Sequence, residues 1–255
     1  MSNPLMQKSF EELRNGVVLA ELGGYGDGSY CAKHGKGAAL VMLGTYIVDA
    51  GDSVPYPSHF VFKPDRQCYF PYLQEHIGIA RSSGARVGIS VISINVSDTV
   101  DFLKAAQDAG VDYASLCAHS AMNMFTSVGL GSALCRRENR AQLKEWAKAI
   151  LKAVQLPVIF KIGFQPDIIG AVNVITSAGI PIVHLNVGNT ESGSKSLAIL
   201  GELKSKCPFL IGGGGIRNIE GAKRVLKAGA DAVAIGTAAM KDPNFCGQIQ
   251  NLLRK

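Results

Sequence analysis

The sequence contains no apolar run of the roughly 18–20 residues that a membrane-spanning helix needs. Its first residues, MSNPLMQKSFEEL, lack an apolar signal core, so we expect a cytoplasmic protein. Charged residues make up only 18% of the 255-residue chain, and no linker or low-complexity stretch interrupts it. Disorder is therefore excluded, and the length suffices for one large domain with a substantial core.

Cysteine pairs with metal-ligand spacing are also missing. The six cysteines form no C-x-x-C pair, so we interpret them as free thiols and expect no structural zinc site. The formal net charge of +6 favours an anionic ligand or RNA only weakly, because the basic residues are spread along the chain without clustering. Neither a metal centre nor a nucleic-acid stripe is predicted.

Eight apolar, β-branched runs recur along the chain. Continuous apolar runs are typical of parallel strands that are buried on both faces. Most gaps between them hold a helical pattern, as in residues 99–110, 138–154 and 219–230, and two of these patterns end in Ala-Gly, the expected C-terminal stop. The predicted strands cover residues 17–22, 38–44, 85–93, 112–118, 156–163, 180–186, 207–213 and 231–237.

This pattern predicts an α/β fold, a single (β/α)₈ TIM barrel domain over residues 1–255. An open doubly wound sheet is the competing architecture, but eight regular units that fill the length favour closure. Residues 49–73 follow the second strand and form a long segment rich in proline and aromatic residues. We predict a loop here and consider it a lid candidate, because long loops at this end of a barrel commonly serve as lids. A surface loop that packs its own aromatic side chains is the alternative.

The strongest chemical signal is a pair of glycine turns, IGGGGIRN (211–218) and AVAIGTAAM (232–240). Glycines let the backbone approach a ligand and turn its N–H groups toward it, and strands seven and eight of such barrels often bind phosphate. Gly214, Gly215, Gly236 and Thr237 are the expected donors. A tight turn without a ligand is the alternative. The pattern indicates a phosphate but not the cofactor that carries it.

Three further strand ends resemble the tRNA-dihydrouridine synthases. LAELGGYGD (19–27) resembles their first strand, DYASLCAHSAMNMFTSVGLGSAL (112–134) their fourth-strand segment, and VIFKIG (158–163) their fifth strand, whose lysine contacts the flavin ring. The dihydroorotate dehydrogenases share this layout, and GGGI is closer to their pattern. The chain thus resembles this superfamily of FMN-binding barrel oxidoreductases, and it resembles the synthases without their helical, tRNA-gripping C-terminal domain.

The resemblance implies FMN as the cofactor. It places Ala20, Glu21 and Leu22 along the flavin and Lys161 beside its ring, where a lysine stabilises negative charge on the reduced ring. Glu21 replaces the family's proline, and we expect it to face substrate or to pair with Lys161. The full set of implied cofactor contacts is Ala20, Glu21, Leu22, Ser93, Lys161, Asn186, Gly213, Gly214, Gly215, Gly236 and Thr237.

Departures from the family concern proton transfer. The synthases' catalytic cysteine aligns with Ser120, their histidine with Asn186 and their strand-three glutamine with Ser93. The candidate catalytic residues are therefore His119, which titrates near neutrality, Ser120 and Cys117. His119 as a structural hydrogen-bonding group and Cys117 as an inert core thiol are the alternatives, and His184 is interpreted as a core histidine.

The sequence therefore predicts an FMN-dependent oxidoreductase that acts on a C=C or CH–CH bond of a small pyrimidine-like heterocycle. NAD(P)H is a candidate electron donor. A tRNA-dihydrouridine synthase without the RNA-binding domain, a flavin-free phosphate-binding lyase or synthase, and a non-catalytic flavin binder are the alternatives. We expect no metal and no membrane partner, and the oligomeric state, including a homo-oligomer, is left open.

Overall fold

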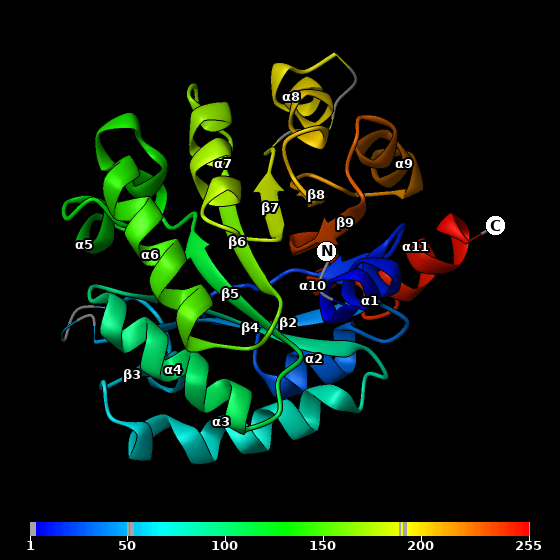
Figure 1. Cartoon of the computed structure of the whole chain (residues 1–255). Helices are drawn as coiled ribbons and strands as arrows, with labels where there is room; N and C mark the ends of the chain where they lie inside the picture. Colours follow the sequence, from blue (N-terminus) through cyan, green and yellow to red (C-terminus); the bar gives the residue numbers. More distant parts are fainter. Residues whose placement is uncertain (1–3, 50, 52–53, 189, 191–192, 255) are drawn as a thin grey trace.

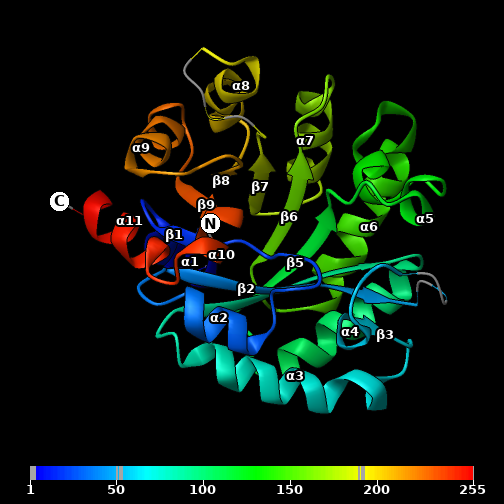
Figure 2. The same cartoon turned by 180° about the vertical axis from the view of Figure 1, so that it is seen from behind.

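The computed structural model describes residues 4–49, 51, 54–188, 190 and 193–254. Its centre is a closed parallel barrel, because β1 pairs in parallel with both β2 and β9. Figures 1 and 2 show the strands enclosed by helices, as predicted for a (β/α)₈ barrel. The barrel strands are β1 (Val17–Leu19), β2 (Leu40–Val48), β4 (Arg86–Ser93), β5 (Tyr113–Ala118), β6 (Val158–Gly163), β7 (Ile182–Asn186), β8 (Phe209–Gly213) and β9 (Ala232–Ile235).

The helices between the strands end where the sequence indicated. Gly110 and Gly229 follow the helices before β5 and β9, with φ of 91° and 123°, a conformation that glycine adopts without strain. Within the described residues, no helix is long and apolar enough to cross a membrane. The α-helices are α1 (Pro4–Leu13), α2 (Gly28–His34), α3 (Arg66–Arg81), α4 (Val96–Asp108), α5 (Asn123–Thr126), α6 (Arg140–Ala153), α7 (Ile168–Ser177), α8 (Lys195–Lys204), α9 (Ile219–Lys227), α10 (Thr237–Lys241) and α11 (Phe245–Leu253).

The segment after β2 is shorter than the predicted loop of residues 49–73. It contains the 3₁₀ turn η1 (Ser58–Phe60) and the short strand β3 (Val61–Phe62), and α3 begins at residue 66. Pro71 lies inside α3, so a residue that indicated a loop is part of a helix. The rings of Phe60 and Phe62 pack 5.2 Å and 5.7 Å from that of Tyr46, in an aromatic cluster beside β2. Residues 50, 52 and 53 of the segment lie outside the described residues.

Two further 3₁₀ turns, η2 (Gly131–Cys135) and η3 (Arg137–Asn139), connect α5 to α6. They belong to the long segment that follows β5. The backbone N–H of Ser132 donates to the Ser120 carbonyl at 2.8 Å, so η2 holds the first residues after β5 in place.

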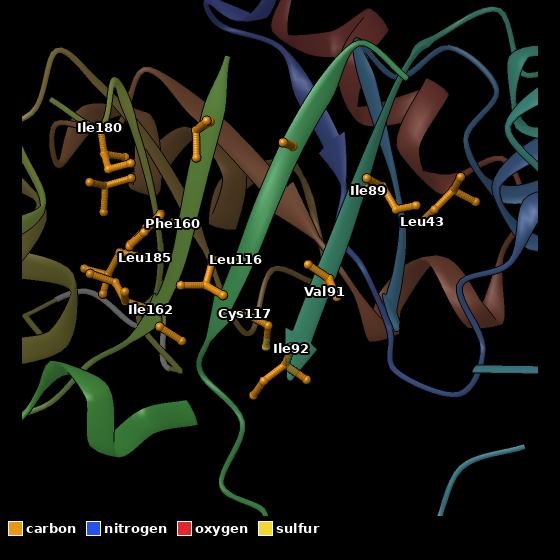
Figure 3. Close-up of a cluster of buried hydrophobic side chains, with 14 of the residues drawn as sticks. Leu43, Ile89, Val91, Ile92, Leu116, Cys117, Phe160, Ile162, Ile180 and Leu185 are labelled. Atoms are coloured by element: carbon orange, nitrogen blue, oxygen red, sulfur yellow. The ribbon is translucent and has the colours of Figure 1, made fainter. Parts of the chain in front are cut away.

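Alternating side chains of the barrel strands point inward and outward. Outward residues such as Leu116 and Phe160 join the large core between strands and helices, part of which Figure 3 shows. Inward residues such as Ile159 and Ile182 form a smaller core within the barrel. Two residues beyond these last two, on the same inner face, lie Lys161 and His184. Alternation along the strands therefore places these two polar side chains inside the barrel, near the carboxyl ends of the strands.

Candidate functional site

Two cavities adjoin at the carboxyl ends of the barrel strands. The glycine cavity, of about 240 Å³, is bounded by the turns after β8 and β9, and the His119 cavity, of about 570 Å³, by the segment after β5. Both are lined by Glu21, Leu22, Lys161 and Asn186, so they are two parts of one cleft.

All but one of the residues singled out from the sequence line this cleft. Cys117, His119 and Ser120 line the His119 cavity. The glycine cavity is lined by Ala20, Glu21, Leu22, Lys161, Asn186, Gly213, Gly214, Gly215, Gly236 and Thr237. Residues from six separate strand ends thus meet at one place, as a parallel barrel requires.

Ser93 is the exception. Its neighbour Ile92 lines the His119 cavity, so Ser93 points to the opposite, helix-covered face of β4. The Ser93 hydroxyl is fully buried, donates to the Asn95 carbonyl at 2.6 Å and lies 2.7 Å from Thr99 Oγ1. Ser93 therefore lies outside the cleft, contrary to the sequence prediction that it contacts a cofactor. Its hydrogen bonds instead connect β4 to the start of α4.

The glycine cavity presents backbone N–H groups. The N–H groups of Gly214, Gly215, Gly236 and Thr237 have no backbone acceptor among the described residues. Gly214 and Gly215 have φ of 105° and 70°, so glycine is required for this turn. A Cβ at Gly236 would meet only Leu22 Cδ2, at 3.5 Å, so the space above this backbone is open toward the cavity.

A buried ion pair lies between the two cavities. Lys161 Nζ is 3.3 Å from Glu21 Oε2, and the two residues are only 8% and 3% exposed. Burial by itself raises the pKa of the Glu21 carboxyl, but Lys161 leads the opposing interactions that hold this pKa below its ordinary value. Glu21 is therefore ionised, and it pairs with Lys161 as one of the two sequence expectations proposed.

His184 also lines the glycine cavity, although the sequence reading treated it as a core histidine. Burial, followed by the nearby Lys161, lowers the pKa of His184 to about 3. The imidazole is therefore neutral at physiological pH. The alternation of side chains along a strand could have identified His184 as a cleft residue, because Asn186, two residues further along β7, lies on the same face.

His119 and Asn186 are joined across the cleft. Asn186 Nδ2 lies 3.1 Å from His119 Nε2, and Asn186 Oδ1 accepts the backbone N–H of Gly188 at 2.9 Å. Burial and Lys161 lower the pKa of His119, whereas Glu21 acts in the opposite direction. His119 Nδ1 is buried and has no hydrogen-bond partner among the described residues.

Sequence reasoning did not single out Tyr56 and Thr45, which complete the wall of the His119 cavity. A Cβ at Gly23 would lie 2.3 Å from Tyr56 Oη, so the tyrosine packs directly on the chain that follows β1. Tyr56 belongs to the segment predicted as a lid candidate. Its position over the cavity agrees with that role, which stays a prediction.

The described residues contain no group of three or more His, Cys, Asp or Glu side chains that could hold a metal ion. The cleft can instead bind an anion through backbone N–H groups at one end. At its other end a thiol, a hydroxyl and an imidazole are available for proton transfer.

Comparison with known sequences gives two kinds of match. A family profile described as "Histidine biosynthesis protein" matches residues 161–254, a part of the chain that contains the glycine cavity's strand ends β6 to β9. An uncharacterized protein of Methanocaldococcus jannaschii is 28% identical over 251 residues, covering 92% of this chain and 95% of that protein. The subunit HisF of imidazole glycerol phosphate synthase from Dictyoglomus thermophilum is 41% identical over 71 residues, 27% of this chain and 28% of that protein. A phosphoribosyl imidazole-4-carboxamide isomerase of Burkholderia mallei is 52% identical over 48 residues, 19% of each chain.

Solved structures with the same fold bear names of oxidoreductases. Morphinone reductase superimposes with a TM-score of 0.71 at 13% identity, covering 94% of this chain and 86% of that chain. FabK from Thermotoga maritima gives 0.58 at 13% identity, covering 94% of this chain and 63% of that chain. At such identities the likeness shows the fold alone. The named matches of both kinds are enzymes, but the matching profile is that of histidine biosynthesis and not of either flavoprotein family that the motifs resemble.

Proposed function

We propose that the cleft binds FMN and that the protein is an FMN-dependent oxidoreductase acting on a C=C or CH–CH bond of a small pyrimidine-like heterocycle. The observation that carries the proposal is the shared wall of the two cavities, which includes Lys161 and Asn186. A ligand that leaves its phosphate among the glycines extends past Lys161 to the edge of the His119 cavity.

The glycine cavity suits the phosphate. Backbone N–H groups without protein acceptors are the donors that phosphate oxygens need. Among the described lining residues, Glu21 is the one acidic side chain, and its charge is already paired with Lys161. Each hydrogen bond to a charged group is worth about 1.5–3 kcal/mol, so two or three of these N–H groups suffice to hold an anion.

The residues also fit the rest of FMN. The open space over Gly236 admits a ligand close to the backbone. Lys161 provides a cation at the centre of the cleft, where the polar edge of the ring would lie. The cleft has two chambers. The larger one, the His119 cavity of about 570 Å³, leaves room for a small-molecule substrate beside the flavin. Bound here, FMN would supply hydride transfer.

The chain's own residues divide the remaining work. Ala20 and Leu22 would border the ring of bound FMN, and Lys161, which is paired with Glu21, would stabilise negative charge on it. Cys117, His119 and Ser120 face the substrate chamber and hold or accept the proton that accompanies hydride transfer. Ser120 Oγ accepts the Met122 N–H at 3.3 Å, which leaves its own hydrogen for the chamber.

Ligand titration tests this proposal. Flavin-free protein is titrated with FMN and, as the matched control, with riboflavin, which has the same ring without the phosphate. We expect one FMN per chain and a clear preference for FMN over riboflavin. Protein that binds neither flavin contradicts the proposal, and equal binding of both places the ring in the cleft but the phosphate elsewhere.

Turnover is tested on the FMN-loaded protein. NADH and NADPH are offered as donors, and pyrimidines, dihydropyrimidines and unmodified tRNA are offered while flavin absorbance is followed. Reaction with the free heterocycles supports the small-molecule proposal. Reaction with tRNA alone supports the dihydrouridine synthase alternative, and stable flavin without any turnover supports a binder.

The match over residues 161–254 favours a second candidate, a flavin-free enzyme that acts on a phosphorylated compound. The named relatives include a phosphoribosyl isomerase that matches 48 residues of this chain. The glycine cavity would hold the phosphate in the same way, and the ionised Glu21 and neutral His184 could then act on the ligand itself. Calorimetry with ribose 5-phosphate separates the two candidates, because tight binding of this ester by a protein that does not bind FMN supports the second.

A further inference from the structure

The hydrogen bonds of Asn186 determine which of its side-chain atoms faces His119. The Gly188 N–H donates to Asn186 Oδ1 at 2.9 Å. If the amide were turned over, its NH₂ group would face this N–H, and two donors would meet. Gly188 therefore fixes Asn186 with Nδ2 toward His119.

The orientation of Asn186 in turn determines which ring nitrogen of His119 carries the proton. Asn186 Nδ2 is a donor and lies 3.1 Å from His119 Nε2, so Nε2 accepts this hydrogen bond and has no proton of its own. The neutral imidazole has its single proton on Nδ1. An imidazolium would have a second proton on Nε2, directed at the NH₂ group of Asn186, so protonation has to break this hydrogen bond.

The surroundings of His119 act in the same direction. Burial, and after it Lys161 from β6, disfavours a positive charge on His119. His184 from β7 is neutral, and Glu21 from the end of β1 is the one opposing charge in this group. His119 Nδ1 lies against Gly163, where a Cβ would come within 2.6 Å of it. The ring therefore accepts a hydrogen bond from Asn186 at Nε2, and its Nδ1 edge lies close to Gly163, which has no Cβ to displace it.

We propose that Asn186 is a positioning residue that keeps His119 neutral, with its proton on Nδ1, through the neutral pH range. In this state His119 is a proton acceptor and not an imidazolium acid. In the proposed oxidoreductase, oxidation of a CH–CH bond to C=C would send a hydride to bound FMN and the proton to His119 Nε2, in place of the Asn186 hydrogen bond. The kinetic part of this inference depends on the proposed function, but the protonation state of His119 does not.

The first test needs no flavin, and it uses a variant only to assign signals. Nitrogen-15 NMR of histidine-labelled protein distinguishes protonated from unprotonated ring nitrogens, and the His119→Gln spectrum identifies the His119 signals. We expect one protonated nitrogen, Nδ1, and one unprotonated nitrogen, Nε2, at pH 7. An imidazolium or a proton on Nε2 at this pH overturns the proposal.

The second test reverses a single hydrogen bond. The substitution Asn186→Asp keeps the acceptor for Gly188 and replaces the donor toward Nε2 by a carboxylate oxygen. A carboxylate at this distance favours the charged imidazole, so we expect the pKa of His119 to rise by about 1–3. Asn251→Asp adds the same charge on α11, away from the cleft, and should leave this pKa unchanged.

The outcomes separate this inference from the proposed function. An unchanged His119 pKa in folded Asn186→Asp protein overturns the role of Asn186, whatever the enzyme does. If the protein fails to bind FMN but the NMR results are as expected, only the proposed function is lost. If it is active, the low-pH limb of the substrate half-reaction should move upward in Asn186→Asp together with the NMR-measured pKa, and a purely structural role would not produce this shift.

Discussion

Lys161 Nζ lies 3.3 Å from both Glu21 Oε2 and the Glu21 carbonyl oxygen, so one buried ammonium holds the side chain and the main chain of a single residue. The two residues come from strands that are not neighbours, because β7, β8 and β9 lie between β6 and β1. The ion pair therefore spans the barrel axis between the two cavities. Both Glu21 carboxylate oxygens are buried and have no hydrogen-bond partner among the described residues, so the charge of Glu21 depends heavily on Lys161.

Removing Lys161 should therefore be costly. Lys161→Met leaves a buried carboxylate without its cation, and breaking such a pair lowers the free energy of unfolding by about 3–5 kcal/mol. The double substitution Glu21→Gln with Lys161→Met leaves no uncompensated charge, so it should be less destabilising than Lys161→Met alone. Urea denaturation of the three proteins measures the difference.

The surface pair of Arg86 and Glu12 is the control. Its side chains are 42% and 29% exposed, so Glu12→Gln should change the free energy of unfolding by no more than about 1 kcal/mol. If Lys161→Met were as mild as this control, the buried pair would not stabilise the barrel as we infer.

His184 should make the protein sensitive to acid. Its pKa is about 3 in the folded chain, against an ordinary value of 6.5, so the unfolded chain binds the proton more readily. Folding stability due to the neutral imidazole is thus complete above pH 6.5 and falls as the pH decreases toward 3. One pKa unit corresponds to about 1.4 kcal/mol, so the full effect is on the order of 5 kcal/mol.

Denaturation midpoints measured between pH 7 and pH 4 test this dependence. His184→Gln cannot take up the proton, so its midpoint should fall less steeply with acid than that of the natural protein. His59→Gln removes an exposed histidine and should leave the slope unchanged. Parallel slopes for all three proteins would show that His184 is not held neutral.

Much of the architecture follows from local sequence. The strands were predictable because inward and outward positions are both apolar, and two helix ends because Gly110 and Gly229 follow them. The start of α3 could not be predicted, because Pro71 and the surrounding aromatic residues are typical of loops. There Asp65 accepts the Gln67 N–H at 2.9 Å, a helix N-cap that the prediction overlooked.

The site was predictable where it depends on one strand end and not where it depends on two. Gly214 and Gly236 lie in glycine-rich turns that are visible in the sequence. His119 and Asn186 are 67 residues apart, and only the closed barrel brings them to 3.1 Å. Ser93 was misplaced because an alignment of strand ends does not determine which face of the strand each residue occupies.

Gly236→Val should weaken FMN binding. A Cβ would enter open space beside Leu22, but φ of −109° with ψ of −103° lies outside the regions that residues with a Cβ favour, so circular dichroism first checks that the variant is folded. The added side chain keeps the phosphate from the N–H groups, and losing even one hydrogen bond to a charged group, about 1.5–3 kcal/mol, weakens binding roughly tenfold or more. Fluorescence titration with FMN measures the change.

Gly214→Val is a less selective probe, because a Cβ there would lie 2.2 Å from Asn186 Oδ1 and the residue has positive φ. Gly78→Val is the matched control, since a Cβ at Gly78 on α3 meets nothing within 4 Å. Unchanged FMN affinity in folded Gly236→Val would place the phosphate outside the glycine cavity.

The last prediction concerns the two half-reactions of the proposed enzyme. The proton that accompanies substrate conversion has to pass through His119, Ser120 or Cys117, which line the larger cavity. His119→Ala should slow the half-reaction with substrate by roughly 10²–10⁴-fold, the usual contribution of a general acid or base. The half-reaction of the flavin with its second redox partner should be almost unaffected, because it does not use this group.

Stopped-flow measurement of both half-reactions decides among the three residues, with Ser120→Ala and Cys117→Ala as parallel variants. Selective slowing by His119→Ala supports the assignment. Equal slowing of both half-reactions would mean that His119 maintains the cleft through its hydrogen bond with Asn186 and transfers no proton. If only Cys117→Ala slowed the substrate step, the thiol would be the proton-transfer group, although it lies three residues before Ser120, the position that the sequence resemblance aligns with the catalytic cysteine of the tRNA-dihydrouridine synthases.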